Sequence, residues 1–88
     1  MAADNTQALI KAVQAALAGD WHGAHNIAQD YNDNTANWVH AVLHKIEPDE
    51  WNSRYWYRRT DREYEDYKDS TEEFKAILEK LKSAKGIN

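Results

Sequence analysis

The chain has 88 residues, which suffice for one small domain and exclude separate cofactor-binding and substrate-binding domains. Apolar residues make up 42% of the chain and charged residues 30%, a balance typical of a globular protein rather than a disordered one. The formal net charge of −4 disfavours a general nucleic-acid binder, and the absence of cysteine excludes disulfide bonds, thiolate zinc sites and cysteine nucleophiles.

The N-terminal third of the sequence predicts two helices. Asp4 and Gln7 form a capping-box pattern, and apolar residues then recur at helical spacing as far as Gly19, so we expect a helix over about 5–18. Asp20 is expected to cap a second helix, which the polar run after it ends. The inward face of that second helix is expected to carry Trp21, Ala24, Ile27, Ala28 and Tyr31.

The middle of the chain predicts two more helices and one ambiguous segment. A third helix is expected from about Thr35, and its wide apolar arc places it centrally, with neighbours on two sides. Pro48 fits the first turn of a fourth helix, where its missing N–H is not needed. Residues 61–69 suit either an extension of that helix or a loop anchored by tyrosines. The apolar arc of the third helix comprises Trp38, Val39, Val42, Leu43 and Ile46.

The last helix has the clearest local signals. Ser70 and Glu73 form a second capping-box pattern, and Gly86 suits the C-terminal stop. A narrow apolar stripe between them comprises Phe74, Ile77, Leu78 and Leu81. Since no segment alternates apolar and polar residues, we expect an all-α fold, a compact bundle of four to five antiparallel helices forming a single domain over residues 1–88.

Two segments resemble known helical proteins. Trp38–Lys45 (WVHAVLHK) and Asn52–Thr60 (NSRYWYRRT) are similar to WVHAxLHRxEGD and NAxYWYRRA in a group of small uncharacterised bacterial proteins. Residues 19–61, which include the GDW sequence followed by Ala24, also resemble tetratricopeptide and Sel1-like repeats, with an offset of 29 residues between helix starts. The resemblance implies a compact helical domain with tetratricopeptide-like helix pairing, and it transfers no catalytic residue.

Histidines on the predicted third helix form a candidate metal site. His40, His44 and Glu47 lie at i, i+4 and i+7, so they share one helix face, and His25 is positioned to join them from the second helix. Imidazoles and a carboxylate on one face suit zinc or another divalent ion. Alternatively, the two histidines border the core and form hydrogen bonds to backbone or to Asp30. No HExxH zinc motif is present.

A basic and aromatic pattern on the predicted fourth helix is a candidate protein-binding surface. Arginines recur every four residues with aromatic residues between them, and both residue types are enriched at protein interfaces. The candidate residues are Arg54, Trp56, Tyr57, Arg58 and Arg62. Alternatively, neighbouring carboxylates pair with these arginines and the aromatic rings belong to the core.

The sequence lacks the patterns of common enzymes. It has no nucleophile elbow, no glycine-rich phosphate loop and no supported acid–base pair, so we predict no catalytic residue and no enzyme. The leading hypothesis is therefore a non-enzymatic module that binds a protein partner or itself, with nucleic acid disfavoured. The alternative is a domain that binds a divalent metal such as zinc. With no apolar run near the roughly 20 residues of a membrane span and no export signal, we expect no membrane partner and a cytoplasmic location.

Overall fold

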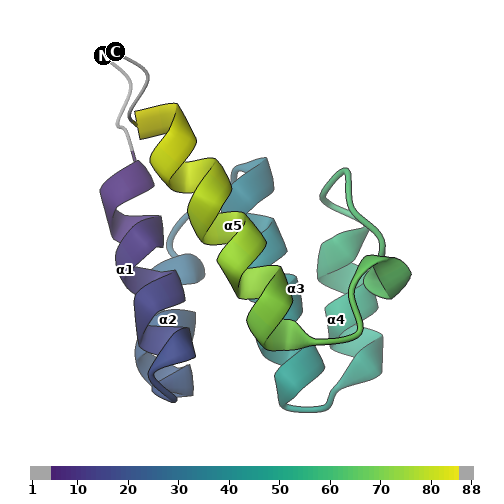
Figure 1. The fold of residues 1–88 in the computed structure, drawn as a ribbon. Helices are drawn as coiled ribbons and strands as arrows, with labels where there is room; N and C mark the ends of the chain where they lie inside the picture. Colours follow the sequence, from purple (N-terminus) through teal and green to yellow (C-terminus); the bar gives the residue numbers. More distant parts are fainter. Residues whose placement is uncertain (1–4, 86–88) are drawn as a thin grey trace.

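The computed structural model describes residues 5–85, apart from the side chains of residues 84 and 85, and this part of the chain is helical without strands. Its elements are α1 (Thr6–Leu17), α2 (Trp21–Ala28), α3 (Asn34–Ile46), α4 (Glu50–Tyr57), the short 3-10 helix η1 (Tyr64–Asp66) and α5 (Ser70–Lys85). Two helical hairpins, α1–α2 and α3–α4, stand side by side, and α5 packs against α1 and α3 (Figure 1). The predicted all-α bundle is confirmed. None of these helices is both long and apolar enough to span a bilayer.

Aspartates begin three of the helices. The side chains of Asp20, Asp33 and Asp49 accept hydrogen bonds from the backbone N–H groups of Gly23, Ala36 and Asn52, respectively. Each such cap stabilises a helix by about 1 kcal/mol, because it satisfies a backbone donor of the first turn. Since Asp49 is the cap of α4, Pro48 precedes the helix, and the expectation that it lies in the first turn is wrong.

The turn between α1 and α2 has the predicted glycine stop. Gly19 has a φ of +90°, a left-handed conformation that side chains rarely adopt, so the chain reverses direction there at little cost. The residue before α1, Asn5, makes no side-chain cap. The predicted capping role of Asp4 and the predicted stop at Gly86 lie outside the described residues.

Helix α3 is the centre of the bundle. Every residue from Ala36 to His44 is buried, because the four other α-helices pack around this segment, and the prediction of a central helix is confirmed. The arc ends one turn earlier than expected, since Ile46, the last residue of α3, is 44% exposed. Leu17, the last residue of α1, is likewise 38% exposed.

A buried carboxylate joins three helices at the base of α5. Glu73 is fully buried, and one of its oxygens accepts hydrogen bonds from the indole of Trp38 at 2.8 Å and the hydroxyl of Tyr57 at 2.5 Å. Its other oxygen lies 2.9 Å from the ammonium of Lys45. Burial and the adjacent carboxylate raise the pKa of Tyr57, so its hydroxyl remains a donor. Glu73 therefore links α3, α4 and α5.

The predicted capping box of Ser70 and Glu73 is consequently wrong. The side chain of Asp69 accepts a hydrogen bond from the backbone N–H of Thr71, and α5 begins at Ser70 itself. Glu73 turns away from the helix start, toward the core, because donors from α3 and α4 meet it there.

The ambiguous segment 61–69 is a loop held by a lysine. The ammonium of Lys45 donates hydrogen bonds to the carbonyl oxygens of Tyr64 at 2.9 Å and Tyr67 at 3.1 Å, while it also pairs with the buried carboxylate. The loop alternative is thus confirmed. Because α4 ends at Tyr57, the arginines that follow do not continue along the helix, and the prediction of a helical basic stripe is wrong.

Candidate metal centre

Three histidines from two helices meet between α2 and α3. His40 and His44 lie one turn apart on α3, and both are buried; His25 reaches them from α2 and is partly buried. One potential ligand nitrogen from each of the three lies within 4.8 Å of the other two. The structure therefore brings His25 together with His40 and His44. We refer to His25, His40 and His44 as the histidine cluster.

The closest contact in the histidine cluster joins two like atoms. The Nε2 atoms of His25 and His40 are 3.0 Å apart, so one ring donates a proton and the other accepts it. Two imidazoles on a tetrahedral zinc ion have nitrogens about 3.3 Å apart, given zinc–nitrogen distances of about 2.0 to 2.1 Å. After a small outward movement of the two rings, an ion can replace this hydrogen bond when the proton of the donor ring moves from Nε2 to Nδ1, which keeps both imidazoles neutral.

The protonation state of the histidine cluster favours ligation. Burial, reinforced by the neighbouring His25 and His44, lowers the pKa of His40 to about 4. The pKa of His25 is lowered as well, chiefly by burial and then by His44. Metal ions bind the neutral form of imidazole. These two rings are neutral at neutral pH, so ligation does not require the loss of a positive charge from them.

Glu47 contacts the histidine cluster through His44. Its carboxylate oxygen is 2.7 Å from Nδ1 of His44, and it groups with His44 and Asp49 rather than with His25 and His40. A carboxylate that accepts the Nδ1 proton fixes the tautomer and leaves Nε2 with its lone pair. Glu47 is thus placed to orient His44, and with His44 and Asp49 it also belongs to a second group of potential metal ligands.

Two tryptophans enclose the histidine cluster. Trp56 of α4 stacks on His40 with ring centroids 4.0 Å apart, and Trp21 stacks on His25 at 4.8 Å. The indole N–H of Trp21 donates to the carbonyl of Leu43 at 2.7 Å, which fixes that ring. This enclosure was not predicted from the sequence. The i, i+4 spacing of Trp21 and His25 was an available signal, whereas Trp56 comes from a different helix and had none.

The alternative hypothesis of core histidines is also supported in part. His40 and His44 are buried, but their side-chain partners are His25 and Glu47, whereas Asp30 is exposed and forms no such hydrogen bond among the described residues. Burial and ligation are compatible, because neutral buried imidazoles keep their lone pairs. The burial of His40 and His44 is therefore compatible with either hypothesis.

Four of the five candidate protein-binding residues line one surface pocket of about 340 Å³, namely Arg54, Tyr57, Arg58 and Arg62. Tyr57 is 3% exposed, and Trp56 is covered on one face by His40. Arg54 pairs with Glu50 at 2.6 Å and Glu65 at 2.5 Å, the arrangement that the alternative hypothesis expected. These ion pairs raise the pKa of Arg54 and lower that of Glu65.

The remaining arginines of this group differ in their surroundings. The guanidinium of Arg62 lies 4.1 Å from the ring centroid of Trp38 and is close to Asp61, whereas Arg58 is exposed. A different aromatic residue is open to solvent: Trp51 is 72% exposed and stacks on Tyr55. Neither Trp51 nor its stacking partner Tyr55 is among the five residues predicted to form the protein-binding surface.

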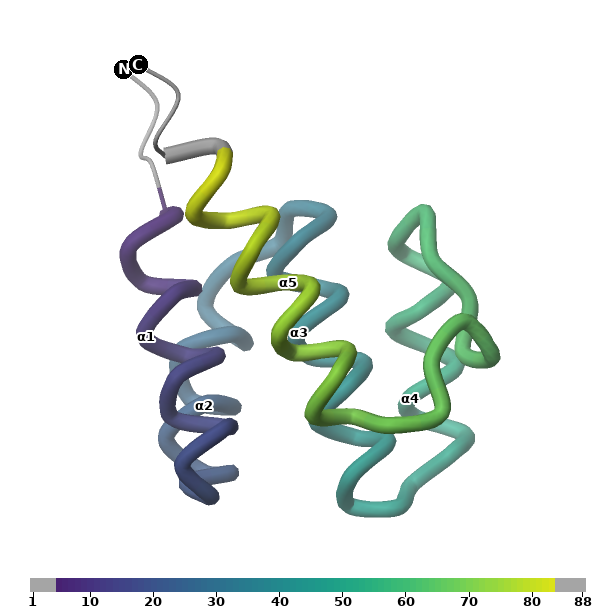
Figure 2. The backbone as a smooth tube through the Cα atoms, in the orientation of Figure 1, coloured from purple at the N-terminus to yellow at the C-terminus, as the bar shows by residue number. Residues whose placement is uncertain are grey.

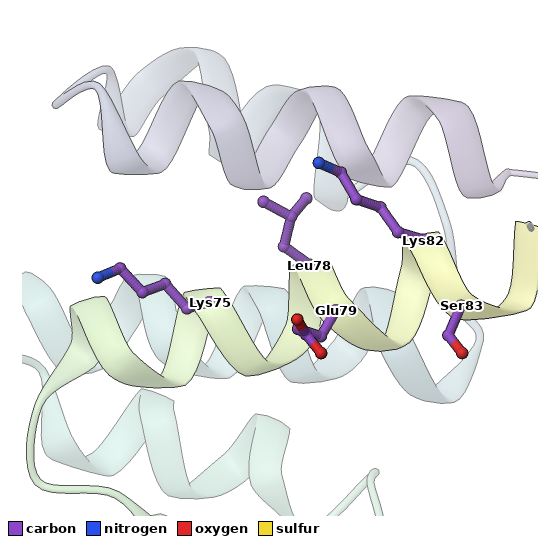
Figure 3. A pocket seen from close by; sticks show the side chains of 5 residues that line it. All are labelled: Lys75, Leu78, Glu79, Lys82 and Ser83. Carbon is purple, nitrogen blue, oxygen red and sulfur yellow. The ribbon is translucent and has the colours of Figure 1, made fainter.

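The surface groove along α5 offers no comparable ligand set. It has a volume of about 540 Å³ and is lined by Lys75, Leu78, Glu79, Lys82 and Ser83. Leu78 and Lys82 point toward α1, and the lining contains a single carboxylate and no histidine (Figure 3).

No protein-family model matches the chain, and neither a curated protein nor a solved structure matches it.

Proposed function

We propose that this domain binds a divalent transition-metal ion such as zinc through His25, His40 and His44. The observation that supports the proposal is the convergence of three imidazoles, one from α2 and two from α3, with potential ligand nitrogens within 4.8 Å. Nitrogen ligands favour zinc, copper, nickel and cobalt over magnesium and calcium. The domain would then sense or buffer such an ion. We propose binding without catalysis, because the adjacent Glu47 is engaged by His44 instead of being free to act as a base.

Zinc titration by calorimetry tests this proposal. We expect one zinc ion per chain at neutral pH, and a cobalt(II) absorption spectrum of the tetrahedral type. Replacing His25, His40 or His44 by alanine should lower zinc affinity by about 100-fold or more, equivalent to about 2.7 kcal/mol, because each variant removes one of three protein ligands.

His22→Ala is the matched control for these variants. His22 lies on α2 like His25 and packs edge-on against Trp21, but it is exposed and does not belong to the histidine cluster. Its removal should leave zinc affinity unchanged. A wild-type protein that gives neither heat nor a cobalt spectrum would contradict the proposal, as would equal losses in His22→Ala and the cluster variants.

Glu47→Gln tests the orienting role of the carboxylate. The substitution removes the charge that favours the Nδ1–H tautomer of His44 and keeps the size of the side chain. We expect zinc affinity to fall by about 10- to 100-fold, as for other partners that orient metal-binding histidines. Glu79→Gln on the exposed face of α5 is the control and should have no effect. Unchanged affinity in Glu47→Gln would show that His44 is oriented by packing alone.

We also propose a second function, protein interaction, on the basis of Trp51. A tryptophan that is 72% exposed and stacked on a neighbouring tyrosine is costly to leave in water, and exposed aromatic residues commonly mark interfaces. We therefore keep the hypothesis of protein interaction and assign the contact to Trp51 instead of the arginines.

A further inference from the structure

A second group of potential metal ligands adjoins the histidine cluster. His44, Glu47 and Asp49 each offer a ligand atom, and these atoms lie within 4.8 Å of one another. The backbone N–H of Asp49 donates to the carbonyl oxygen of His44 at 2.8 Å, so the α3–α4 turn brings the carboxylate back toward the histidine. Figure 2 shows this turn at one end of the bundle, beside the α1–α2 turn. We refer to His44, Glu47 and Asp49 as the outer group.

The outer group is more open to solvent than the histidine cluster. Two of the three histidines in the cluster are buried, and tryptophans stack on two of its rings. In the outer group, the side chain of Glu47 is 44% exposed and Asp49 is partly exposed. Since His44 belongs to both groups, an ion bound at the outer group is already in contact with one ligand of the histidine cluster.

The hydrogen bonds of the outer group leave lone pairs for an ion. The oxygens of Asp49 accept one bond each, from the backbone N–H and the side-chain amide of Asn52, at 3.2 and 3.0 Å. Glu47 accepts from Nδ1 of His44 at 2.7 Å. An ionised carboxylate has about four lone-pair sites, so each can keep its present partner and bind an ion as well. Among the described residues, neither carboxylate forms an ion pair with a lysine or arginine.

His44 can serve only one of the two groups at a time. A neutral imidazole has one protonated nitrogen and one nitrogen with a lone pair. With the proton on Nδ1, where Glu47 accepts it, Nε2 is available to the histidine cluster. With the proton on Nε2, the lone pair of Nδ1 is available to an ion that Glu47 and Asp49 also contact. The two positions are therefore alternatives for one ion, which agrees with one zinc ion per chain.

We propose that the outer group is the entry site through which a divalent transition-metal ion reaches the histidine cluster. This inference rests on the first proposed function. Glu47, Asp49 and Nδ1 of His44 hold the ion first, with water completing its coordination. The ion then moves to His25, His40 and Nε2 of His44, while exchange with water takes the ring proton from Nε2 to Nδ1, where Glu47 accepts it. His44 is neutral, with one ring proton, before and after the transfer.

The kinetics of cobalt(II) uptake by Asp49→Asn test the proposal. Asparagine caps a helix as well as aspartate does, so α4 keeps its start while the outer group loses a charged ligand. We expect the rate constant for appearance of the tetrahedral cobalt(II) spectrum to fall by about fivefold or more, because the charge that attracts the ion is reduced. Release to a chelator should slow by the same factor, since an entry site lies on the path in both directions. The equilibrium affinity should then stay within about twofold of wild type, because it is the ratio of the two rates.

Asp20→Asn is the matched control. Asp20 caps α2 as Asp49 caps α4, and it accepts a hydrogen bond from the backbone N–H of Gly23 at 2.9 Å, but it belongs to neither ligand group. The substitution removes the same charge from the neighbouring turn and should leave both rates unchanged. Equal slowing in the two variants would reveal a general effect of charge and would overturn the proposal. Wild-type rates in Asp49→Asn would do the same and would point to entry past the partly exposed His25.

Equilibrium measurements separate this inference from the function on which it rests. A wild-type protein that develops no cobalt(II) spectrum would contradict metal binding and the entry site together. A wild-type protein that binds cobalt(II), combined with an Asp49→Asn variant that binds it more weakly without slower uptake, would contradict the entry site alone. In that case Asp49 would be a ligand of the final site.

Discussion

Glu73→Ala is expected to destabilise the domain by about 3 to 5 kcal/mol, a large part of the roughly 5 to 15 kcal/mol typical of a domain. The substitution leaves the ammonium of Lys45 nearly buried without its counter-charge. It also removes the acceptor for the indole of Trp38 and the hydroxyl of Tyr57. Urea unfolding followed by circular dichroism measures the loss, and a variant that is unfolded without urea agrees with the upper end of this range.

Two further variants make this prediction specific. Glu72→Ala, which removes an exposed neighbouring carboxylate that is 3.7 Å from Lys75, should change stability by no more than about 0.5 kcal/mol. Combining Glu73→Gln with Lys45→Met should recover part of the stability, since no unpaired buried charge remains and the amide oxygen still accepts hydrogen bonds. The recovery is partial because the carbonyl oxygens of Tyr64 and Tyr67 lose the donor that Lys45 supplies. A loss below about 1 kcal/mol in Glu73→Ala would refute the role of Glu73 as the link between helices.

The metal-free protein is expected to lose about 3 kcal/mol of stability as the pH falls from 6.5 to 4, because His40 must be neutral in the folded state. Its pKa in the folded protein is about 4, against an ordinary value of 6.5, so the unfolded chain binds more protons in this interval. This stabilisation is fully present above pH 6.5 and is lost as the pH falls toward 4. The lowered pKa of His25 acts in the same direction.

Urea unfolding in the presence of a chelator, repeated across this pH interval, checks the effect. His40→Gln should show a flatter dependence of stability on pH than wild type, because the largest contribution has been removed. His22→Gln, at an exposed histidine, should keep the wild-type dependence. Equal slopes for wild type and His40→Gln would contradict the assignment of the acid sensitivity to His40.

The elements of the fold were largely predictable because their signals are local. Apolar residues three or four positions apart define a helix wherever the rest of the chain lies, which is why α2, α3 and α5 were located within a few residues, and the cap Asp20 also marked the start of α2. The pairing of His40 and His44 on one face has the same origin, since one helical turn aligns them. Two of the three residues of the histidine cluster, His40 and His44, therefore followed from spacing alone.

Glu73 shows where local reasoning fails. Glu73 lies three positions after Ser70 and so fits the capping-box pattern. Its actual partners, Trp38, Lys45 and Tyr57, are 35, 28 and 16 residues away in the sequence. Long-range donors to a buried carboxylate outweigh a helix cap, because an unpaired buried donor or charge costs more than an unused cap. Nothing within the last helix distinguishes the two outcomes.

By itself, the sequence determined that the chain forms amphipathic helices, where most of them begin, and which histidines share a face of α3. Only the tertiary structure decided that His25 completes the histidine cluster, that Glu47 orients His44, and that apolar residues at helix ends remain exposed. The physical reason is that helical periodicity specifies the direction of each side chain about its own axis. The neighbour that meets a side chain depends on how separate helices pack.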